Sequence, residues 1–254
     1  MTARRSSRGE PGLGGDQVEG RNAVRELLRA RHRRVSEVWV VSGRDAEVID
    51  EILQLATEVG ARIRHVEPEQ LDARARTDAP QGVLALAAPI PSHDIDDLLQ
   101  QPDAFLLVLD GVTDPQNLGA VLRVAETAGV TGVVLPRHRS ASLTPAAVKA
   151  AAGAVEHLAL ATVSGVPAML ERASRAGLWS VGLDAAGTTD VFALEVADRP
   201  LIVVLGAEGR GLSRLTRERC DLLASIPMRG QIESLNVATA AAVACHAIAR
   251  QRHE

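Results

Sequence analysis

The chain has 254 residues, of which 46% are hydrophobic and 24% charged, and its formal net charge is −4. That length permits one large domain or two smaller ones with a substantial core, and two cysteines without CxxC spacing exclude a disulfide scaffold and indicate the reducing cytoplasm. No apolar run is long enough to span a bilayer and the seven histidines lack metal-ligand spacing, so the sequence predicts no membrane span and no metal.

The first 34 residues are basic. They hold nine arginines against four acidic residues, a local net charge of +5, so the remainder of the chain carries −9. Residues 1–16, rich in Arg, Ser, Gly and Pro, are predicted to be a disordered basic tail. A solvated surface and an RNA contact along Arg21–Arg34 both fit this charge pattern.

Residues 17–88 are predicted to form a small domain of alternating short elements. Apolar residues at helical spacing and β-branched or alternating runs predict helices at 22–30 and 46–59, and strands at 37–41, 61–66 and 82–87. The segment 89–102 opens with Pro89-Ile-Pro-Ser-His93, which breaks both periodicities, so it is predicted to be a linker.

Residues 103–254 alternate apolar strands with helical patterns. The predicted strands are 105–109, 132–135, 158–162, 178–183, 201–205 and 222–226. Runs such as Leu201-Ile-Val-Val-Leu205 are apolar throughout, which is typical of parallel strands covered on both faces. This second domain is therefore predicted to be α/β, with its ligand beyond the carboxyl ends of the strands.

Three loops that follow strands carry the candidate site. In the first, Asp110-Gly-Val-Thr-Asp-Pro-Gln-Asn117 leads into a helix predicted from about residue 118 to residue 128. On this helix Arg123 lies on the side of Gly119, one turn earlier. The small residue either gives a ligand room beside the guanidinium or is a mild defect next to an exposed arginine.

The second loop is Gly206-Ala-Glu-Gly-Arg-Gly211, directly after a buried strand. Its glycine spacing differs from that of dinucleotide sites, and the lysine of a Walker A loop is missing. Glu208 would repel a phosphate, so a ligand here is predicted to bring positive charge or hydroxyls. A plain glycine-rich turn is the alternative.

The third loop, Ile226-Pro-Met-Arg-Gly-Gln-Ile-Glu-Ser-Leu-Asn236, forms a rigid turn before a helix predicted over 237–250. Ser234 or Asn236 can cap that helix, and a cap does not exclude a ligand contact. The helix is apolar nearly all round, so we expect it to be buried within the domain or against a second copy.

Together and in this order, the three loops resemble the signature motifs of SPOUT-superfamily methyltransferases of the TrmH type. Asp110 to Asn117, Arg139-Ser-Ala141 and Leu215-Thr-Arg-Glu-Arg-Cys220 further resemble the RlmB-like subgroup, which methylates the ribose 2′-oxygen of a guanosine in 23S rRNA. The resemblance runs from about Val18 to the C-terminus. It implies a parallel-sheet domain with a trefoil knot, an L30e-like N-terminal α/β domain that binds the RNA substrate, and a homodimer.

The same resemblance implies a set of site residues. Contacts to the cofactor S-adenosylmethionine fall on Leu205, Gly206, Ala207, Gly211, Ile226, Met228 and Leu235. The catalytic set falls on Arg123, Glu208, Ser234 and Asn236, with Asn117 beside them. Candidate phosphate contacts for the RNA are Arg21, Arg31, Arg33 and Arg34. The chain departs from the subgroup at Ala238, where a serine is usual, and at Ala249, near a usual glutamate.

Guanidinium does not deprotonate in proteins, so Arg123 is predicted to clamp a phosphate and stabilise negative charge on the attacking oxygen. Glu208, Ser234 and Asn236 would orient the ribose. The alternatives are methylation of a tRNA ribose or an rRNA adenosine, and a non-catalytic RNA-binding assembly factor. A nucleotide-dependent dehydrogenase is disfavoured by the glycine spacing and by Glu208.

Overall fold

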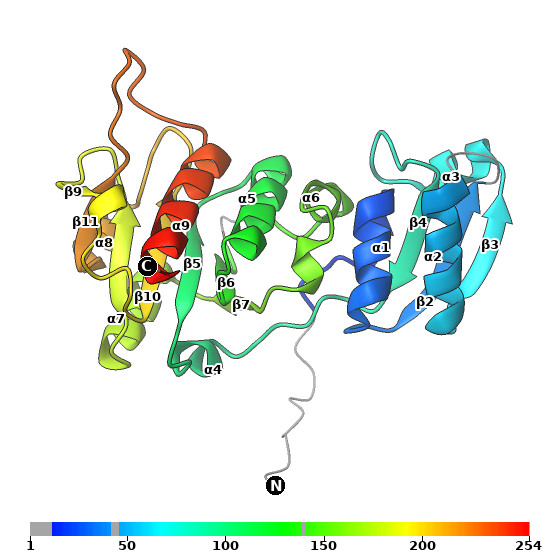
Figure 1. The fold of residues 1–254 in the computed structure, drawn as a ribbon, viewed down its shortest axis with the longest axis horizontal. Coiled ribbons are helices and arrows are strands. Elements are labelled where there is room, and N and C mark those ends of the chain that lie inside the picture. The colour runs from blue at the N-terminus through cyan, green and yellow to red at the C-terminus, as the bar shows by residue number, and fades with distance from the viewer. Residues whose placement is uncertain (1–11, 42–45, 139–140, 254) are drawn as a thin grey trace, which may run out of the picture.

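The computed structural model describes residues 12–41, 46–138 and 141–253. Two sheets, one of four strands and one of seven, occupy separate halves of the molecule (Figure 1). Residues 1–11 of the predicted tail and the first two residues of the Arg139-Ser-Ala141 motif lie outside the described residues.

The N-terminal half is a mixed sheet in the order β1-β4-β2-β3, with two helices packed against one another. Its elements are β1 (Gln17–Glu19), α1 (Arg21–Ala30), β2 (Val35–Val41), α2 (Ala46–Glu58), β3 (Arg62–Val66), α3 (Pro68–Arg74) and β4 (Val83–Ala87). The five predicted elements are confirmed within two residues at each end. β1 was not predicted because it has three residues, and α3 was not predicted because it is largely polar.

The C-terminal half is a parallel sheet in the order β7-β6-β5-β10-β8-β11-β9. Its strands are β5 (Phe105–Asp110), β6 (Gly132–Pro136), β7 (Leu160–Val163), β8 (Trp179–Leu183), β9 (Thr189–Asp190), β10 (Leu201–Gly206) and β11 (Leu222–Ser225). Its helices are α4 (Ile95–Leu99), α5 (Pro115–Thr127), α6 (Pro145–Ala150), α7 (Val166–Arg175), α8 (Arg214–Arg219) and α9 (Val237–His253), with 3-10 turns η1 (Ala154–Glu156) and η2 (Val191–Ala193). The predicted α/β class is confirmed.

Burial explains why the central strands are apolar throughout. In β10, Leu201 and Val203 pack into the core beneath α5 and α9, whereas Ile202 and Val204 pack into a second core on the side of α7. Both faces of the sheet are therefore covered, and the strand ends are left to form the site. Within the described ranges, we find no helix with the length and apolar character needed to cross a bilayer.

Neither alternative for Gly119 is correct, because the glycine neither leaves room for a ligand beside Arg123 nor is a mild defect. Gly119 is buried where α5 meets α6, and a Cβ built on it would lie 2.4 Å from the carbonyl oxygen of Ala147 and 2.5 Å from the Cβ of Ala150. The glycine is needed for helix packing.

Gly119→Ala should therefore destabilise the protein by about 2 kcal/mol through overpacking. An ordinary helical Gly→Ala change stabilises by about 0.5–1 kcal/mol, so the sign of the effect is diagnostic. Urea unfolding measures the change in stability. Ala120→Gly serves as the control, because it gives the cost of a glycine at the neighbouring helical position. A stabilised Gly119→Ala protein would contradict the packing explanation.

Cys245 is buried and Cys220 is partly buried. Burial raises the pKa of the Cys245 thiol to about 12, and burial together with Asp221 and Asp110 raises the pKa of Cys220 to about 12. Because only the thiolate is nucleophilic, both thiols should be protonated and slow to react at pH 8. A disulfide reagent should modify native protein roughly a thousand-fold more slowly than urea-unfolded protein, where the pKa returns to about 8.5. Rapid modification of native Cys245 would refute this.

The chain segments next to the N-terminal domain are ordered against the second domain. The predicted tail is wrong for residues 12–16, because Leu13 N donates to Ile90 O (2.9 Å) and Gly15 N donates to Leu143 O (3.0 Å). The predicted linker 89–102 contains α4, and His93 N donates to the carbonyl oxygen of Leu160, the first residue of β7 (2.7 Å). Several backbone contacts thus fix the two domains to each other.

A buried ion pair reinforces this junction. Arg33, just before β2, donates from Nε to Glu156 Oε2 (2.9 Å) and from Nη2 to Glu156 Oε1 (2.6 Å), and both side chains are 2% exposed. Its Nη1 donates to the carbonyls of Gly15 (2.8 Å) and Ala88 (2.6 Å). The prediction that Arg33 contacts RNA is therefore wrong, because its guanidinium is buried and already bonded.

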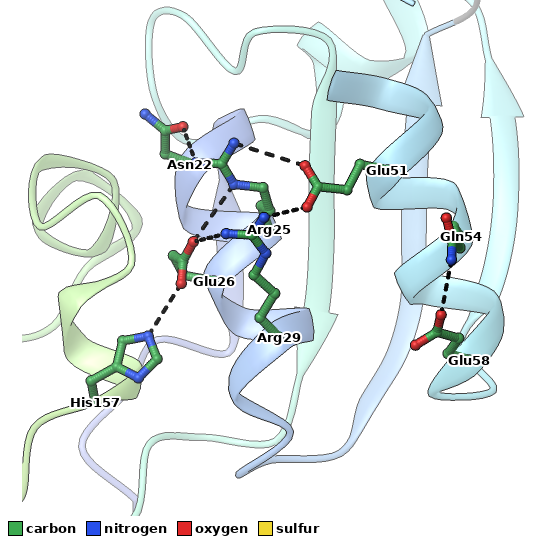
Figure 2. A network of polar contacts seen from close by, with 8 residues as sticks. All are labelled: Asn22, Arg25, Glu26, Arg29, Glu51, Gln54, Glu58 and His157. Carbon is green, nitrogen blue, oxygen red and sulfur yellow. Dashed lines mark hydrogen bonds and ion pairs between the residues drawn. The ribbon is translucent and has the colours of Figure 1, made fainter. Parts of the chain in front are cut away.

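Carboxylates also engage much of the remaining Arg21–Arg34 stretch. Figure 2 shows that Arg25 and Arg29 of α1 each pair with both Glu26 and Glu51. Glu26 also contacts His157 of the second domain, at 3.3 Å. Arg31 pairs with Glu58 at the end of α2. This basic stretch is thus largely compensated by acidic side chains on its own surface.

Candidate active site

A cavity of about 600 Å³ lies beyond the carboxyl ends of β8, β10 and β11. All seven residues predicted to contact the cofactor line it, together with three of the predicted catalytic residues: Leu205, Gly206, Ala207, Gly211, Ile226, Met228 and Leu235, then Glu208, Ser234 and Asn236. Parallel strands that end at one edge of the sheet bring these two distant loops together.

The loop after β10 is a tight turn closed by its own backbone. Ala207 N donates to Gly211 O (3.0 Å), and Gly211 N donates back to Ala207 O (2.8 Å). Gly209 and Gly211 have φ of +72° and +64°, which glycine adopts without strain. A Cβ on Gly206 would lie 2.1 Å from the carbonyl carbon of Gly211, so this glycine is needed for close backbone packing.

Three polar side chains form a closed ring at the edge of the cavity. Asn236 Nδ2 donates to Glu208 Oε1 (2.6 Å) and to Asn117 Oδ1 (3.0 Å), and Asn117 Nδ2 donates to Glu208 Oε2 (3.1 Å). Each comes from a different one of the three loops. The ring therefore fixes both carboxylate oxygens of Glu208 in one orientation.

Local capping holds two members of this ring in place. Asp114 Oδ1 accepts from the backbone N of Gln116 and Asn117 and so begins α5. Asn236 Oδ1 accepts from Ala238 N (2.9 Å) and Thr239 N (3.4 Å) and so begins α9. The predicted cap is thus Asn236, and the same side chain also faces the site.

The chain between β11 and α9 projects from the domain and supplies the outer wall of the cavity (Figure 1, orange). Met228 on this segment is 38% exposed, and Ile232 is 74% exposed. Ser234 is exposed and lines the cavity. Ala238 and Ala249, where the chain departs from the subgroup pattern, pack against the core.

An ion pair that was not predicted from the sequence lies in the cavity wall. Asp184 directly follows β8, and its Oδ1 accepts from Arg217 Nη2 (2.7 Å) and from Ala186 N (2.9 Å). Both charged side chains line the cavity. A carboxylate just past an apolar strand was the available signal, because ligands bind at that edge of a parallel sheet.

Arg123 does not line this cavity. It is exposed on α5 and lines a separate cleft between the two domains, together with Gln116 one residue before the ring member Asn117. Within one chain the structure thus brings together Asn117, Glu208, Ser234 and Asn236, and leaves Arg123 apart.

The cavity suits a cationic nucleoside-like ligand. Its volume lies within the range of small-molecule sites, and Leu205, Ile226 and Leu235 offer apolar surface for a planar ring. Three carboxylates in its lining (Asp184, Glu208 and Glu233) outnumber two arginines (Arg210 and Arg217). In the described ranges, no group of three histidine, cysteine or acidic side chains could hold a metal.

Comparison with known proteins agrees with this geometry. The SpoU rRNA methylase family matches residues 104–246, and the RNA 2′-O ribose methyltransferase substrate-binding family matches residues 17–92. The SpoU methyltransferase AviRb from Streptomyces viridochromogenes, solved in complex with AdoMet, is 26% identical with a TM-score of 0.79 over 94% of this chain and 90% of AviRb.

The chain therefore belongs to the SpoU rRNA methylase family, and the resemblance found in its motifs is confirmed. Relatives in this family include the 23S rRNA (guanosine-2'-O-)-methyltransferases RlmB of two bacteria. That of Shewanella oneidensis is 38% identical over 241 residues, and that of Pasteurella multocida is 40% identical over 242 residues; each match covers 93% of this chain and 98% of the relative.

Proposed function

We propose that this protein transfers a methyl group from S-adenosylmethionine to the ribose 2′-hydroxyl of a guanosine in 23S rRNA. The observation that carries the proposal is the Asn117–Glu208–Asn236 ring at the edge of a cavity with apolar and carboxylate lining. The names of the RlmB relatives support the choice of RNA and nucleotide.

The chain's own groups bind and orient the reactants. Leu205, Ile226 and Leu235 would pack on the adenine, and the excess of carboxylates would favour a positively charged ligand. When bound, S-adenosylmethionine would supply an electrophilic methyl carbon on its sulfonium; attack by the ribose oxygen on that carbon releases S-adenosylhomocysteine, and the hydroxyl proton passes to solvent. The fixed carboxylate of Glu208 and the hydroxyl of Ser234 would position that ribose, where small misplacements are costly.

Arg123 can take part in the reaction only if a second copy of the chain brings it to the cavity. Its positive charge would stabilise the oxygen that loses its proton, yet in one chain it lies outside the cavity. α5 and α9 pack together, and Val124 of α5 and Val243 of α9 are only partly buried within one chain. We propose a homodimer that covers this face and brings Arg123 of one chain to the cavity of the other.

Subunit mixing tests this arrangement. Arg123→Ala and Glu208→Ala proteins should each keep about 1% of wild-type activity or less, and a refolded mixture should recover about a quarter of wild-type activity. The reason is that half of the dimers are mixed and each mixed dimer holds one intact site. A mixture as inactive as its parents would place Arg123 and Glu208 in the same chain's site.

Methyl transfer tests the activity itself. The protein, radiolabelled S-adenosylmethionine and 23S rRNA should give one labelled nucleoside after digestion, 2′-O-methylguanosine. A tRNA pool should stay unlabelled. Label on a base, on adenosine or on tRNA would overturn the assignment of substrate, and absence of label would favour an assembly factor.

Two further features follow from the proposal. The turn 206–211 and the segment 226–236 would form the trefoil knot, supported by the close backbone packing of Gly206 on Gly211. We also propose a cytoplasmic location, which action on ribosomal RNA supports.

A further inference from the structure

A second cavity, of about 490 Å³, lies between the two domains. On the side of the N-terminal domain it is lined by Arg76, on the loop between α3 and β4. On the side of the C-terminal domain it is lined by Lys149 of α6 and Arg123 of α5. We call it the interdomain cleft. Three cationic side chains from three different elements therefore face one cavity.

A buried carboxylate holds the Arg76 loop in position. Glu19 of β1 is fully buried, and its Oε1 accepts from Arg76 N (2.7 Å) and from Gln17 Nε2 (2.7 Å). Its Oε2 accepts from Thr77 N (3.0 Å) and Thr77 Oγ1 (2.5 Å). Burying the Glu19 carboxylate is unfavourable unless it is hydrogen-bonded, and these bonds fix the backbone from which the Arg76 side chain projects.

The cations of the cleft are not compensated as those of α1 are. In the described part of the chain, neither Arg76 nor Arg123 has an ion-pair partner, and Lys149 Nζ donates to the neutral oxygens of Ala79 and Thr77. Glu19 is occupied by its own hydrogen bonds, which leaves Asp78 as the other carboxylate in the lining. The cleft therefore has a positive excess on a chain whose net charge is −4.

We propose that the interdomain cleft binds backbone phosphates of the RNA strand that carries the methylated nucleotide, with Arg76 and Lys149 as contacts that sequence reasoning missed. The inference rests on the proposed function, since Arg123 in the same cleft is the group assigned to the reaction. Arg76 and Lys149 would fix the register of the strand without reading its bases.

Salt dependence of RNA binding tests the role of Arg76. Arg76→Ala should weaken RNA binding about tenfold at low salt and reduce the slope of log affinity against log salt by about 0.7, the value for one phosphate contact to a single strand. Arg62→Ala is the matched control, because Arg62 is 69% exposed on β3 at the opposite edge of the same sheet. Equal losses from both variants, or no loss from Arg76→Ala, would overturn the proposal.

Lys149 offers a second readout, because it is the only lysine in the chain. An amine-acetylating reagent can then modify Lys149 and the N-terminal amine alone. Saturating 23S rRNA should slow acetylation of Lys149 several-fold while the N-terminal amine serves as the internal reference. Unchanged labelling of Lys149 in the RNA complex would refute the contact.

These outcomes separate the cleft from the reaction. Binding and footprinting need no methyl transfer, so they can succeed even where the enzyme assay fails. If RNA is methylated and Arg76 and Lys149 show no effect, the proposed function stands and the cleft proposal is overturned.

Discussion

Glu156→Ala should destabilise the folded protein by about 3–5 kcal/mol, because it leaves the Arg33 guanidinium buried without a counter-charge. Both side chains are 2% exposed, and their two hydrogen bonds join Arg33, just before β2 of one domain, to Glu156 in η1 of the other. Urea unfolding measures the loss, and both domains should unfold in one transition that is shifted to lower urea.

A double variant separates two quantities: the stability lost when one partner of the pair is removed, and the net stability that the intact pair contributes. Arg33→Met with Glu156→Leu should recover much of the lost stability, since apolar replacement of a buried pair is often neutral or stabilising. The exposed pair Arg214–Glu218 provides the control, with less than about 1 kcal/mol lost on Glu218→Ala. A similar small loss for Glu156→Ala would refute the buried junction.

Glu208→Ala should lower kcat about 100-fold, because the two asparagines then lose the carboxylate that fixes them and the ribose loses its orienting group. Affinity for S-adenosylmethionine should fall only a few-fold, since one of three carboxylates in the lining is lost while the apolar lining remains. Steady-state methyl transfer with saturating substrates measures the loss.

Glu233→Ala is the matched control for this effect. Glu233 lines the same cavity and is exposed, and it lies outside the Asn117–Glu208–Asn236 ring. Its replacement should leave kcat within a few-fold of wild type. A loss equal to that of Glu208→Ala would mean that carboxylate charge in general, and not the fixed geometry of the ring, supports the reaction.

The position of the cavity could be predicted from the sequence, because each loop follows an apolar strand and parallel strands end at one edge of the sheet. The cofactor and the residues expected to contact it came from the resemblance of the loop motifs to a known family. The sequence predicted a cap at Ser234 or Asn236 before the apolar helix, and the structure shows that the cap is Asn236.

The errors concern residues whose partners lie far away in the sequence. A run of arginines predicts a basic surface, but Arg33 forms a buried ion pair with Glu156, which lies 123 residues further along the chain. Gly119 was misinterpreted because a side chain at this position would clash with the backbone of α6, and no local sequence pattern reveals that contact. The Glu19 carboxylate that fixes Arg76, 57 residues further along the chain, escaped notice for the same reason.

Titration calorimetry with S-adenosylmethionine tests most directly whether the cavity at the ends of β8, β10 and β11 is the methyl-donor site. Wild-type protein should bind one molecule per chain and give no heat with NAD. Ala240→Trp, which fills the cavity from α9, should abolish binding while the protein stays folded. Failure of the wild-type protein to bind S-adenosylmethionine, or undiminished binding by Ala240→Trp, would contradict the assignment.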